Sequence, residues 1–262
     1  MFTALITGGT SGIGAAFATS LASRGLNLVL VARDTSRLEN FAQEIRSRYR
    51  VDVETLTADL SDRHHVDLVA QRLESTEKPV DVLINNAGFS VKGAIASNDH
   101  TLQDAGFDVM CRAVLVLSSA AARAMTARGE GWILNVSSVA GTVSMGPYSA
   151  IKAWATTFTE SLAVELQGTG VQVTVVLPGW VRTEFHARAG ISGSSIPNWL
   201  WLDANSMVEE ALQDMIRGKV VSVPTWRYKI LTSVVKIAPR PAIHTASRLL
   251  NGARARERKH DS

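Results

Sequence analysis

Short apolar runs alternate with longer helical patterns along this 262-residue chain, and this alternation constrains the fold more than any other feature. The runs show no apolar–polar alternation, as expected for strands of a parallel sheet that is covered on both faces. Strands separated by helix-length segments require right-handed crossovers, so we predict one α/β domain with a doubly wound parallel sheet of about seven strands. The predicted strands are Leu5–Thr7, Leu28–Ala32, Asp52–Leu56, Val82–Asn85, Ile133–Val136, Val173–Leu177 and Val220–Val223.

The composition indicates a globular domain without disulfides or metal. Apolar residues make up 46% of the chain, enough for a sizeable core, and charged residues only 19%. The single cysteine, Cys111, lies in an apolar helical pattern and is expected to be a buried, inert thiol. The six histidines show no metal-ligand spacing, so we expect no metal. The N-terminus lacks a basic signal region and we find no run of about 18 apolar residues, so we expect a cytoplasmic protein without a bilayer-spanning segment.

The charge is distributed unevenly along the chain. The net charge of the whole chain is +3, yet Thr225–Ser262 contains nine Lys and Arg against two Asp and Glu, a local net charge of +7. Residues 1–224 therefore carry −4, and nothing in them indicates a nucleic-acid partner. We predict a folded domain at residues 1–224 and a basic, apolar C-terminal extension at residues 225–262.

The first predicted strand is followed by a glycine-rich turn and the alanine-rich helix Ala15–Ser23. Glycines let the backbone turn sharply and approach a pyrophosphate, whose charge then lies at the helix N-terminus. The spacing Gly8-x₃-Gly12-x-Gly14 is not the usual G-x-G-x-x-G pattern, but its place between strand and helix predicts a dinucleotide-binding, Rossmann-like domain. The cofactor contacts predicted in this turn are Gly8, Thr10, Ser11, Gly12, Ile13 and Gly14.

The end of the second strand indicates which dinucleotide binds. NAD enzymes usually place a carboxylate there for the ribose 2′-hydroxyl, whereas this strand ends in Ala32 and Arg33. A guanidinium binds a 2′-phosphate that a carboxylate would repel, so Arg33 favours NADP(H) over NAD(H). Two alternatives stay open: Asp34 can reach a hydroxyl, and Arg33 can be an exposed loop residue. Arg37 is either a second phosphate contact or part of a solvated helix face.

Six motifs in a fixed order resemble those of the short-chain dehydrogenase/reductase family and cover roughly residues 3–184. They are Thr7-Gly8 with Gly12-Ile13-Gly14, Asp59-Leu60, Asn85-Asn86-Ala87-Gly88, Ile133–Ser138, Tyr148-Ser-Ala-Ile-Lys152 and Pro178-Gly179-Trp-Val-Arg-Thr183. The resemblance, chiefly to NADP-dependent carbonyl and ketoacyl reductases, implies an oxidoreductase with catalytic Ser138, Tyr148 and Lys152. Further cofactor contacts implied are Asp59, Leu60, Asn86, Ala87, Gly88, Tyr148, Lys152, Pro178, Gly179, Val181 and Thr183. An alternative for the asparagines is that they only cap a strand-to-helix turn.

Two departures from the family pattern concern the catalytic site. The family usually has an asparagine in the helix before the serine strand, where this chain has Met110. In the family that asparagine helps to hold a water on the proton path, largely through its backbone carbonyl. The resemblance therefore implies that Met110 can keep the carbonyl contact but not the side-chain one, so we expect a slower proton relay. Ser138 precedes Tyr148 by ten residues, where about thirteen is usual, so the choice of Ser138 over Ser137 is less secure.

The predicted chemistry is hydride transfer at a carbonyl or alcohol carbon with Tyr148 as the proton donor. A free tyrosine, with a pKa of about 10, is a poor proton shuttle at neutral pH. A spacing of four residues places Tyr148 and Lys152 on one helix face, where a nearby ammonium is expected to lower the tyrosine pKa. Lys152 is also expected to bind the cofactor ribose, and Ser138 to hold the substrate oxygen.

Substrate selection is expected from a lid at about residues 184–206. The large apolar residues of this region and its neighbours suit a bulky hydrophobic substrate, such as a long-chain ketoacyl group, although they equally suit a simple cover over the sheet. They are Trp180, Phe185, Trp199, Leu200, Trp201 and Trp226.

The C-terminal extension alternates apolar, aromatic and basic residues. An amphipathic helix of this composition suits peripheral contact with an anionic membrane, and a packing arm against the domain or a partner subunit is an equal alternative. Resemblance favours a homodimer or homotetramer built on helices at residues 101–127 and 148–167. Other functions to weigh are a non-catalytic NADP(H) sensor and a peripheral-membrane interaction protein.

Overall fold

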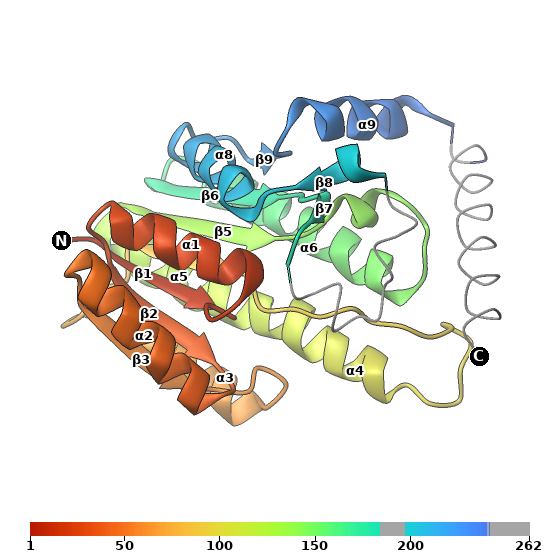
Figure 1. Ribbon diagram of the computed structural model, residues 1–262. Helices are drawn as coiled ribbons and strands as arrows, with labels where there is room; N and C mark the ends of the chain where they lie inside the picture. The colour runs from red at the N-terminus through yellow and green to blue at the C-terminus, as the bar shows by residue number, and fades with distance from the viewer. Residues whose placement is uncertain (184–196, 240, 242–262) are drawn as a thin grey trace.

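The computed structural model describes residues 1–183, 197–239 and 241. A seven-stranded sheet runs through its centre in the order β3-β2-β1-β4-β5-β6-β9, with every neighbouring pair parallel (Figure 1). The predicted fold class is confirmed, and all seven predicted strands are present within a few residues of their expected bounds. They are β1 (Thr3–Thr7), β2 (Asn27–Ala32), β3 (Val53–Thr57), β4 (Val82–Asn85), β5 (Gly131–Val136), β6 (Val171–Val176) and β9 (Val221–Ser222).

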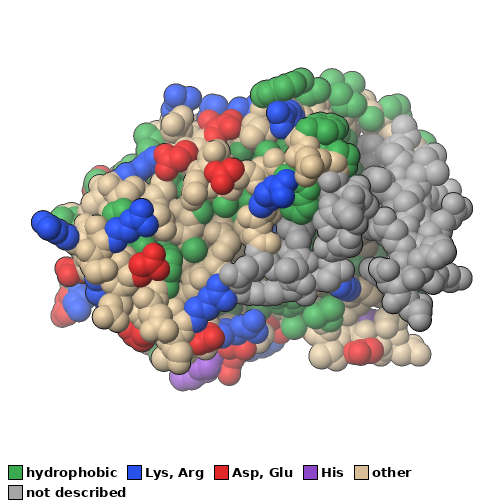
Figure 2. All heavy atoms as spheres, in the orientation of Figure 1, with side chains coloured by type: hydrophobic (Ala, Val, Ile, Leu, Met, Phe, Trp, Pro, Cys, Tyr) green, Lys and Arg blue, Asp and Glu red, His purple; other side chains and the backbone are tan. Residues whose placement is uncertain are grey.

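Helices cover both faces of the sheet. One face carries α1 (Gly12–Ser23), α2 (Thr35–Tyr49) and α8 (Ala204–Ile216), and charged side chains of both signs cover their outer surface (Figure 2). The other face carries α3 (Arg63–Leu73), α5 (Ala113–Arg128) and α6 (Pro147–Glu165). Because successive strand residues point to opposite faces, both sets of side chains must be apolar, which explains why the strands do not alternate in polarity.

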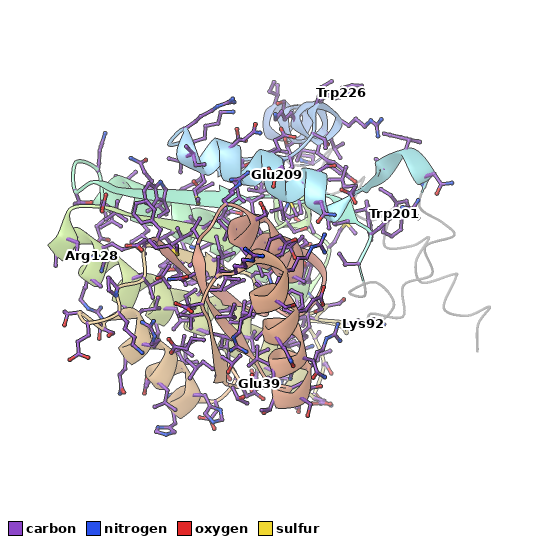
Figure 3. All side chains as sticks on the ribbon, turned by 60° about the vertical axis from the view of Figure 1, so that its left-hand side comes forward. Glu39, Lys92, Arg128, Trp201, Glu209 and Trp226 are labelled. Atoms are coloured by element: carbon purple, nitrogen blue, oxygen red, sulfur yellow. The ribbon has the colours of Figure 1, made fainter. Side chains whose placement is uncertain are left out.

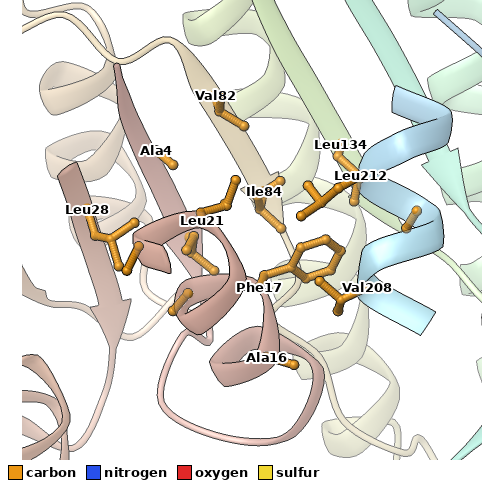
Figure 4. Close-up of a cluster of buried hydrophobic side chains, with 14 of the residues drawn as sticks. Ala4, Ala16, Phe17, Leu21, Leu28, Val82, Ile84, Leu134, Val208 and Leu212 are labelled. Atoms are coloured by element: carbon orange, nitrogen blue, oxygen red, sulfur yellow. The ribbon is translucent and has the colours of Figure 1, made fainter. Parts of the chain in front are cut away.

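An ionic contact joins the two helices α1 and α8, which lie side by side on the first face. Glu209 of α8 (Figure 3) accepts a hydrogen bond from the hydroxyl of Ser20 in α1 at 2.5 Å and pairs at 2.5 Å with Arg24, which caps the C-terminus of α1. Beneath these contacts, Phe17 of α1 and Leu212 of α8 are fully buried against the sheet (Figure 4). Burial of each such side chain contributes about 1.5–3 kcal/mol, so this core sets the position of α1 relative to the strands.

The strand order reverses between β1 and β4. From β1 the chain first builds outwards to β2 and β3, and it then returns to place β4 on the other side of β1. In open α/β sheets, the crevice outside the carboxyl ends of the strands at such a point is where ligands bind. The glycine turn after β1 and the Asn85–Gly88 segment after β4 both lie at this edge.

A long helical segment spans residues 101–128 in three parts: α4 (Thr101–Phe107), a π-helical turn (Asp108–Arg112) and α5. By length and composition it is apolar enough to cross a bilayer, although no single apolar run in it is long. More than half of its most apolar window is buried, because α5 packs on α3, β4 and β5. We therefore assign it to the core of the domain. The π-helical turn was not predicted from the sequence.

The chain beyond β6 forms a small second sheet and a terminal helix. β7 (Trp180–Val181) pairs in parallel with β8 (Trp201–Leu202), and α9 (Trp226–Ile237) follows β9. The small sheet was not predicted. Most of the predicted lid, residues 184–196, lies outside the described residues, as does the predicted basic end of the chain.

Candidate active site

The glycine turn after β1 is held in a shape that side chains would prevent. Gly8 and Gly12 have φ values of 64° and 53°, in the left-handed region that favours glycine. A Cβ on Gly14 would collide with the carbonyl of Gly8 and lie 2.5 Å from Nδ2 of Asn86. The bare backbone thus forms a cradle over the N-terminus of α1, where unpaired N–H groups and the helix dipole favour a phosphate. This cradle fits the pyrophosphate of a dinucleotide.

Asn86 and Thr7 hold the cradle from below. Nδ2 of Asn86 donates to the carbonyls of Thr7 and Gly8 at 3.0 and 3.2 Å. The Thr7 hydroxyl in turn accepts from the backbone N–H groups of Asn86 and Ala87 at 3.0 and 3.1 Å. The side chain of Asn86 therefore joins the end of β4 to the glycine turn. Its neighbour Asn85 is buried and donates to Asn135 at 2.9 Å, which is a core contact.

The residues after β2 form the predicted nucleotide-selecting corner. Asp34 caps α2, since its carboxylate accepts a hydrogen bond from the N–H of Arg37 at 3.0 Å. Arg37 is half-buried rather than on a solvated face, and its Nε donates to the carbonyl of Thr10 in the glycine turn at 3.2 Å. Arg33 is exposed at the same corner. The guanidinium groups of Arg33 and Arg37 thus belong to this corner. The carboxylate of Asp34, the alternative contact for a ribose hydroxyl, caps α2.

Asp59 and Leu60 lie beside this corner. The carboxylate of Asp59 accepts hydrogen bonds from the N–H and the hydroxyl of Ser61 at 3.0 and 2.8 Å. Burial raises the pKa of Asp59, but the Ser61 hydrogen bonds and the charge of Arg33 together hold it below its usual value. Asp59 is therefore ionised at neutral pH, and Leu60 is buried in the core next to it.

The two candidate serines at the end of β5 have different surroundings. Ser137 is buried, and its hydroxyl donates to the carbonyl of Lys152 at 2.7 Å and contacts the Thr156 hydroxyl at 2.8 Å. Ser138 accepts from the N–H of Ala140 at 3.1 Å, which caps a short 3₁₀ turn, and it shares a side-chain hydrogen bond with Tyr148. The structure therefore places Ser138, and not Ser137, against the tyrosine.

Tyr148 and Lys152 lie one turn apart on α6, as predicted. Nζ of Lys152 is 5.8 Å from the centre of the Tyr148 ring and donates to the carbonyl of Val136 at 2.8 Å. Burial lowers the pKa of Lys152 to about 8, so the ammonium is still the main form at pH 7. A Cβ on Gly88 would lie 3.8 Å from this Nζ, so the segment after β4 passes directly beside it.

The pKa of Tyr148 differs from the sequence expectation. Burial raises it to about 12, and the hydrogen bond with Ser138 lowers it by less. The expected lowering by Lys152 does not dominate, because the lysine ammonium is directed at the Val136 carbonyl and the phenol lies in a buried setting. At neutral pH Tyr148 therefore keeps its proton, which is the form that a proton donor needs.

Met110 occupies the π-helical turn, where the family pattern has asparagine. It is 1% exposed and packs in an apolar cluster with Val91 and Ile151, against which the Tyr148 ring also packs. Its Sδ lies 3.0 Å from where a Cβ on Gly88 would be. The side chain therefore seals this wall of the site with apolar atoms. Cys111 belongs to the same cluster, and burial raises the pKa of its thiol to about 11. This agrees with the expected buried, inert thiol.

The loop after β6 closes the other side of the site. The side chain of Thr183 approaches the glycine turn, with its Cβ 3.1 Å from where a Cβ on Gly12 would be. A cleft of about 360 Å³ opens here between α1 and α8, lined in part by Gly12, Arg182 and Thr183. Pro178 contacts the Ser138 hydroxyl through its carbonyl at 3.5 Å, and Val181 is buried in the core. The loop therefore brings Thr183 beside the cradle and the carbonyl of Pro178 beside Ser138.

Sequence reasoning missed Tyr228 of α9. Its ring packs directly on Gly179, where any Cβ would overlap it, and its hydroxyl accepts from the N–H of Trp180 at 3.0 Å and donates to the carbonyl of Leu200 at 2.8 Å. Tyr228 is 1% exposed and belongs to the main core. No local pattern marks it, because its hydrogen-bond partners lie 28 and 48 residues away in the chain.

The large apolar residues beyond β6 do not form one surface. Trp180 and Trp201 are partners across the small sheet, with ring centres 6.1 Å apart. Trp199 and Trp226 are exposed instead, and Leu200 packs against the core. The sixth residue of this predicted group, Phe185, lies outside the described residues.

Comparisons with known proteins agree with this geometry. The family model described as short chain dehydrogenase matches residues 2–191. An uncharacterised oxidoreductase of Staphylococcus saprophyticus is 35% identical over 183 residues, which cover 69% of this chain and 78% of that protein. A short-chain dehydrogenase from Sphingobium yanoikuyae, solved in complex with NADPH, is 33% identical with a TM-score of 0.82, over 90% of this chain and 94% of that one. The bulky-bulky ketone specific alcohol dehydrogenase from Comamonas testosteroni is 32% identical with a TM-score of 0.78, over 90% and 92%. The chain belongs to the short-chain dehydrogenase family and is an oxidoreductase.

Proposed function

We propose that this oxidoreductase uses NADPH to reduce the carbonyl of a bulky, hydrophobic ketone, such as a long-chain ketoacyl or other lipid-like compound, or oxidises the alcohol in reverse. One observation carries the proposal: Ser138 and Tyr148 share a hydrogen bond one helical turn from Lys152, at the edge of the sheet that holds the glycine cradle. A sensor without turnover would not need this set of groups.

The residues divide the chemistry between them. When bound over the glycine cradle, a reduced nicotinamide cofactor would supply the hydride that the carbonyl carbon accepts. Ser138 and Tyr148 bind the carbonyl oxygen, and Tyr148 transfers its proton to that oxygen as negative charge develops there. The Lys152 ammonium then stabilises the phenolate that remains until it is reprotonated from solvent. A hydride and a proton are thus added, and the product is an alcohol.

Two arginines support the preference for NADPH. Arg33 is exposed at the end of β2, and Arg37 is held against the glycine turn by its contact with Thr10. Asp34 caps α2, so one oxygen of its carboxylate already accepts a hydrogen bond from the N–H of Arg37. This arrangement favours a ligand with a 2′-phosphate. A similar protein was solved with NADPH, which agrees with the proposal.

The apolar wall beside Tyr148 supports a hydrophobic substrate. Val91, Met110 and Ile151 are buried there, and Phe89 and Trp154 pack against them. A polar substrate placed against this wall would lose hydrogen bonds to water without replacing them. The similar dehydrogenase named for bulky ketones is consistent with this class of substrate.

The test is the rate of NADPH and NADH oxidation with ketones of increasing chain length. We expect a preference for NADPH of about tenfold or more, and a rate that rises with chain length. Arg33→Ala should reduce that preference, whereas Arg48→Ala, an exposed arginine at the far end of α2, should not. Equal use of both cofactors would reject the preference, and absence of turnover with every ketone and alcohol would reject the reaction.

A further inference from the structure

Helix α9 carries an apolar stripe on the side that faces away from the domain. Trp226, Ile230, Val234 and Ile237 follow one another at helical spacing and are 67%, 56%, 59% and 85% exposed. Hydrophobic side chains gather over this helix at the upper edge of Figure 2, and Trp226 lies at the outer edge of the molecule in Figure 3. Contiguous exposed apolar surface of this kind marks an interaction site.

The opposite side of α9 is fixed to the domain. Tyr228 and Thr232 are 1% and 5% exposed. Glu210 of α8 accepts from the N–H of Thr225 at 2.8 Å and pairs with Lys229 at 2.6 Å. Thr225 adopts a φ of 73°, a left-handed conformation that a threonine takes only when its surroundings impose it. These contacts hold the helix in one rotational orientation, so the stripe faces outwards in the folded protein.

The charge of this part of the chain identifies what the stripe contacts. Helix α9 contains three basic residues and no acidic one, and residues 225–262 carry a net charge of +7 against −4 for the rest. At about 100° per residue, Arg227 and Lys229 lie on opposite sides of the stripe, but Lys229 is paired with Glu210, so Arg227 is the basic residue beside the stripe that can meet a headgroup. Apolar and tryptophan side chains beside a basic residue match the boundary between lipid chains and anionic headgroups. A two-fold contact between two copies of the stripe would instead bring two segments of charge +7 together, which repulsion opposes.

We propose that α9 docks this protein on the surface of a membrane that contains anionic lipids, with Trp226, Ile230 and Val234 inserted at the headgroup boundary. The proposal is independent of the substrate. The first turn of α9 lies beside the loop before β8, since Arg227 donates to the carbonyl of Trp199 at 2.6 Å. Trp199 is itself 60% exposed and extends the apolar surface.

Sedimentation of the full chain with lipid vesicles tests this proposal. We expect binding to phosphatidylcholine vesicles that contain a third phosphatidylglycerol, and binding at least about tenfold weaker to pure phosphatidylcholine or in high salt. The double variant Ile230→Glu/Val234→Glu should lower binding to the anionic vesicles by about tenfold or more. Both side chains are exposed, so thermal unfolding of this variant should match that of the wild type.

The matched control is Leu68→Glu, at an exposed apolar position of α3 on the other face of the sheet, which should bind as the wild type does. Two results would overturn the proposal. The first is that the wild type does not bind anionic vesicles; if the double variant then also changes its mass in sedimentation velocity, the stripe is a contact between copies of the chain. The second is that the double variant binds as well as the wild type, which assigns binding to the basic residues beyond α9.

Discussion

The ring of Tyr228 packs on the Cα of Gly179, 49 positions earlier in the chain. Through this contact the terminal helix touches the loop that follows β6, next to the candidate cofactor site. The Tyr228 hydroxyl adds hydrogen bonds to Trp180 at the start of β7 and to Leu200 just before β8. One side chain of α9 therefore holds both strands of the small sheet.

Tyr228→Phe should loosen that sheet. The ring stays, but the N–H of Trp180 and the carbonyl of Leu200 lose a buried partner, which costs about 1–3 kcal/mol of unfolding free energy. Under the proposed function we place the small sheet beside the substrate, so KM for the ketone should rise more than kcat falls. Urea unfolding and steady-state kinetics measure both effects. Tyr49→Phe, at the end of α2, is the control, and equal behaviour of the two variants would contradict the prediction.

Tyr148→Phe should abolish the proton transfer while it leaves the cofactor site intact. We expect turnover to fall by about 10²–10⁴-fold, the usual range for loss of a general acid. The dissociation constant of NADPH, measured by fluorescence titration, should stay nearly unchanged because the phenol hydroxyl hydrogen-bonds Ser138 and not the glycine cradle. Undiminished turnover in this variant would rule out Tyr148 as the proton donor.

The buried ammonium of Lys152 should make stability depend on pH. The folded protein holds the Lys152 pKa at about 8, below the ordinary value of 10.5. Between these pH values the unfolded chain keeps the proton that the folded chain has released. The unfolding free energy of the wild type should therefore rise with pH across this window, by at most about 3 kcal/mol, and the penalty should be complete below pH 8.

Lys152→Met isolates this effect. The variant has no charge to bury, so its stability curve should lack the rise that the wild type shows above pH 8. Urea unfolding of both proteins at several pH values between 7 and about 10 gives the comparison. Parallel curves for the wild type and the variant would show that the ammonium is not destabilised by burial.

Met110→Asn should separate packing from proton relay. An asparagine amide in the apolar cluster beside Val91 and Ile151 is expected to lower the unfolding free energy by about 1–3 kcal/mol. Turnover should be retained or increased, because the amide adds a polar group near Lys152 and the backbone carbonyl is unchanged. Met110→Leu should keep both stability and turnover. A large loss of turnover in Met110→Leu would instead show that the thioether takes part in the chemistry.

Features with a local signal were predictable. The strands are short apolar runs, so β1, β2 and β4 were found from residue patterns alone. The glycines of the cofactor turn were also found from a local pattern. Gly8 has a left-handed φ, and a Cβ on Gly14 would collide with the carbonyl of Gly8 six residues earlier. The spacing of Tyr148 and Lys152 likewise predicted that they share a helix face.

Features that depend on distant partners were not predictable. The π-helical turn at Asp108–Arg112 has no sequence signature, and the small sheet pairs Trp180 with Trp201 across 21 positions. The pKa of Tyr148 was predicted to fall and is raised instead, because burial depends on everything that packs around the phenol. The placement of Arg37 against Thr10 is another contact between separate elements.

The sequence by itself determined the layers of the fold, the glycine turn between β1 and α1 and the shared helix face of Tyr148 and Lys152, because periodicity, glycine sterics and helical spacing act over a few residues. Only the tertiary structure decided that Ser138 rather than Ser137 contacts Tyr148, and that the apolar stripe of α9 faces outwards. Both outcomes depend on how a side chain is turned by contacts from other elements. The anchor of α9 is the clearest case, since Tyr228 reaches its buried position only when Gly179 leaves room for its ring.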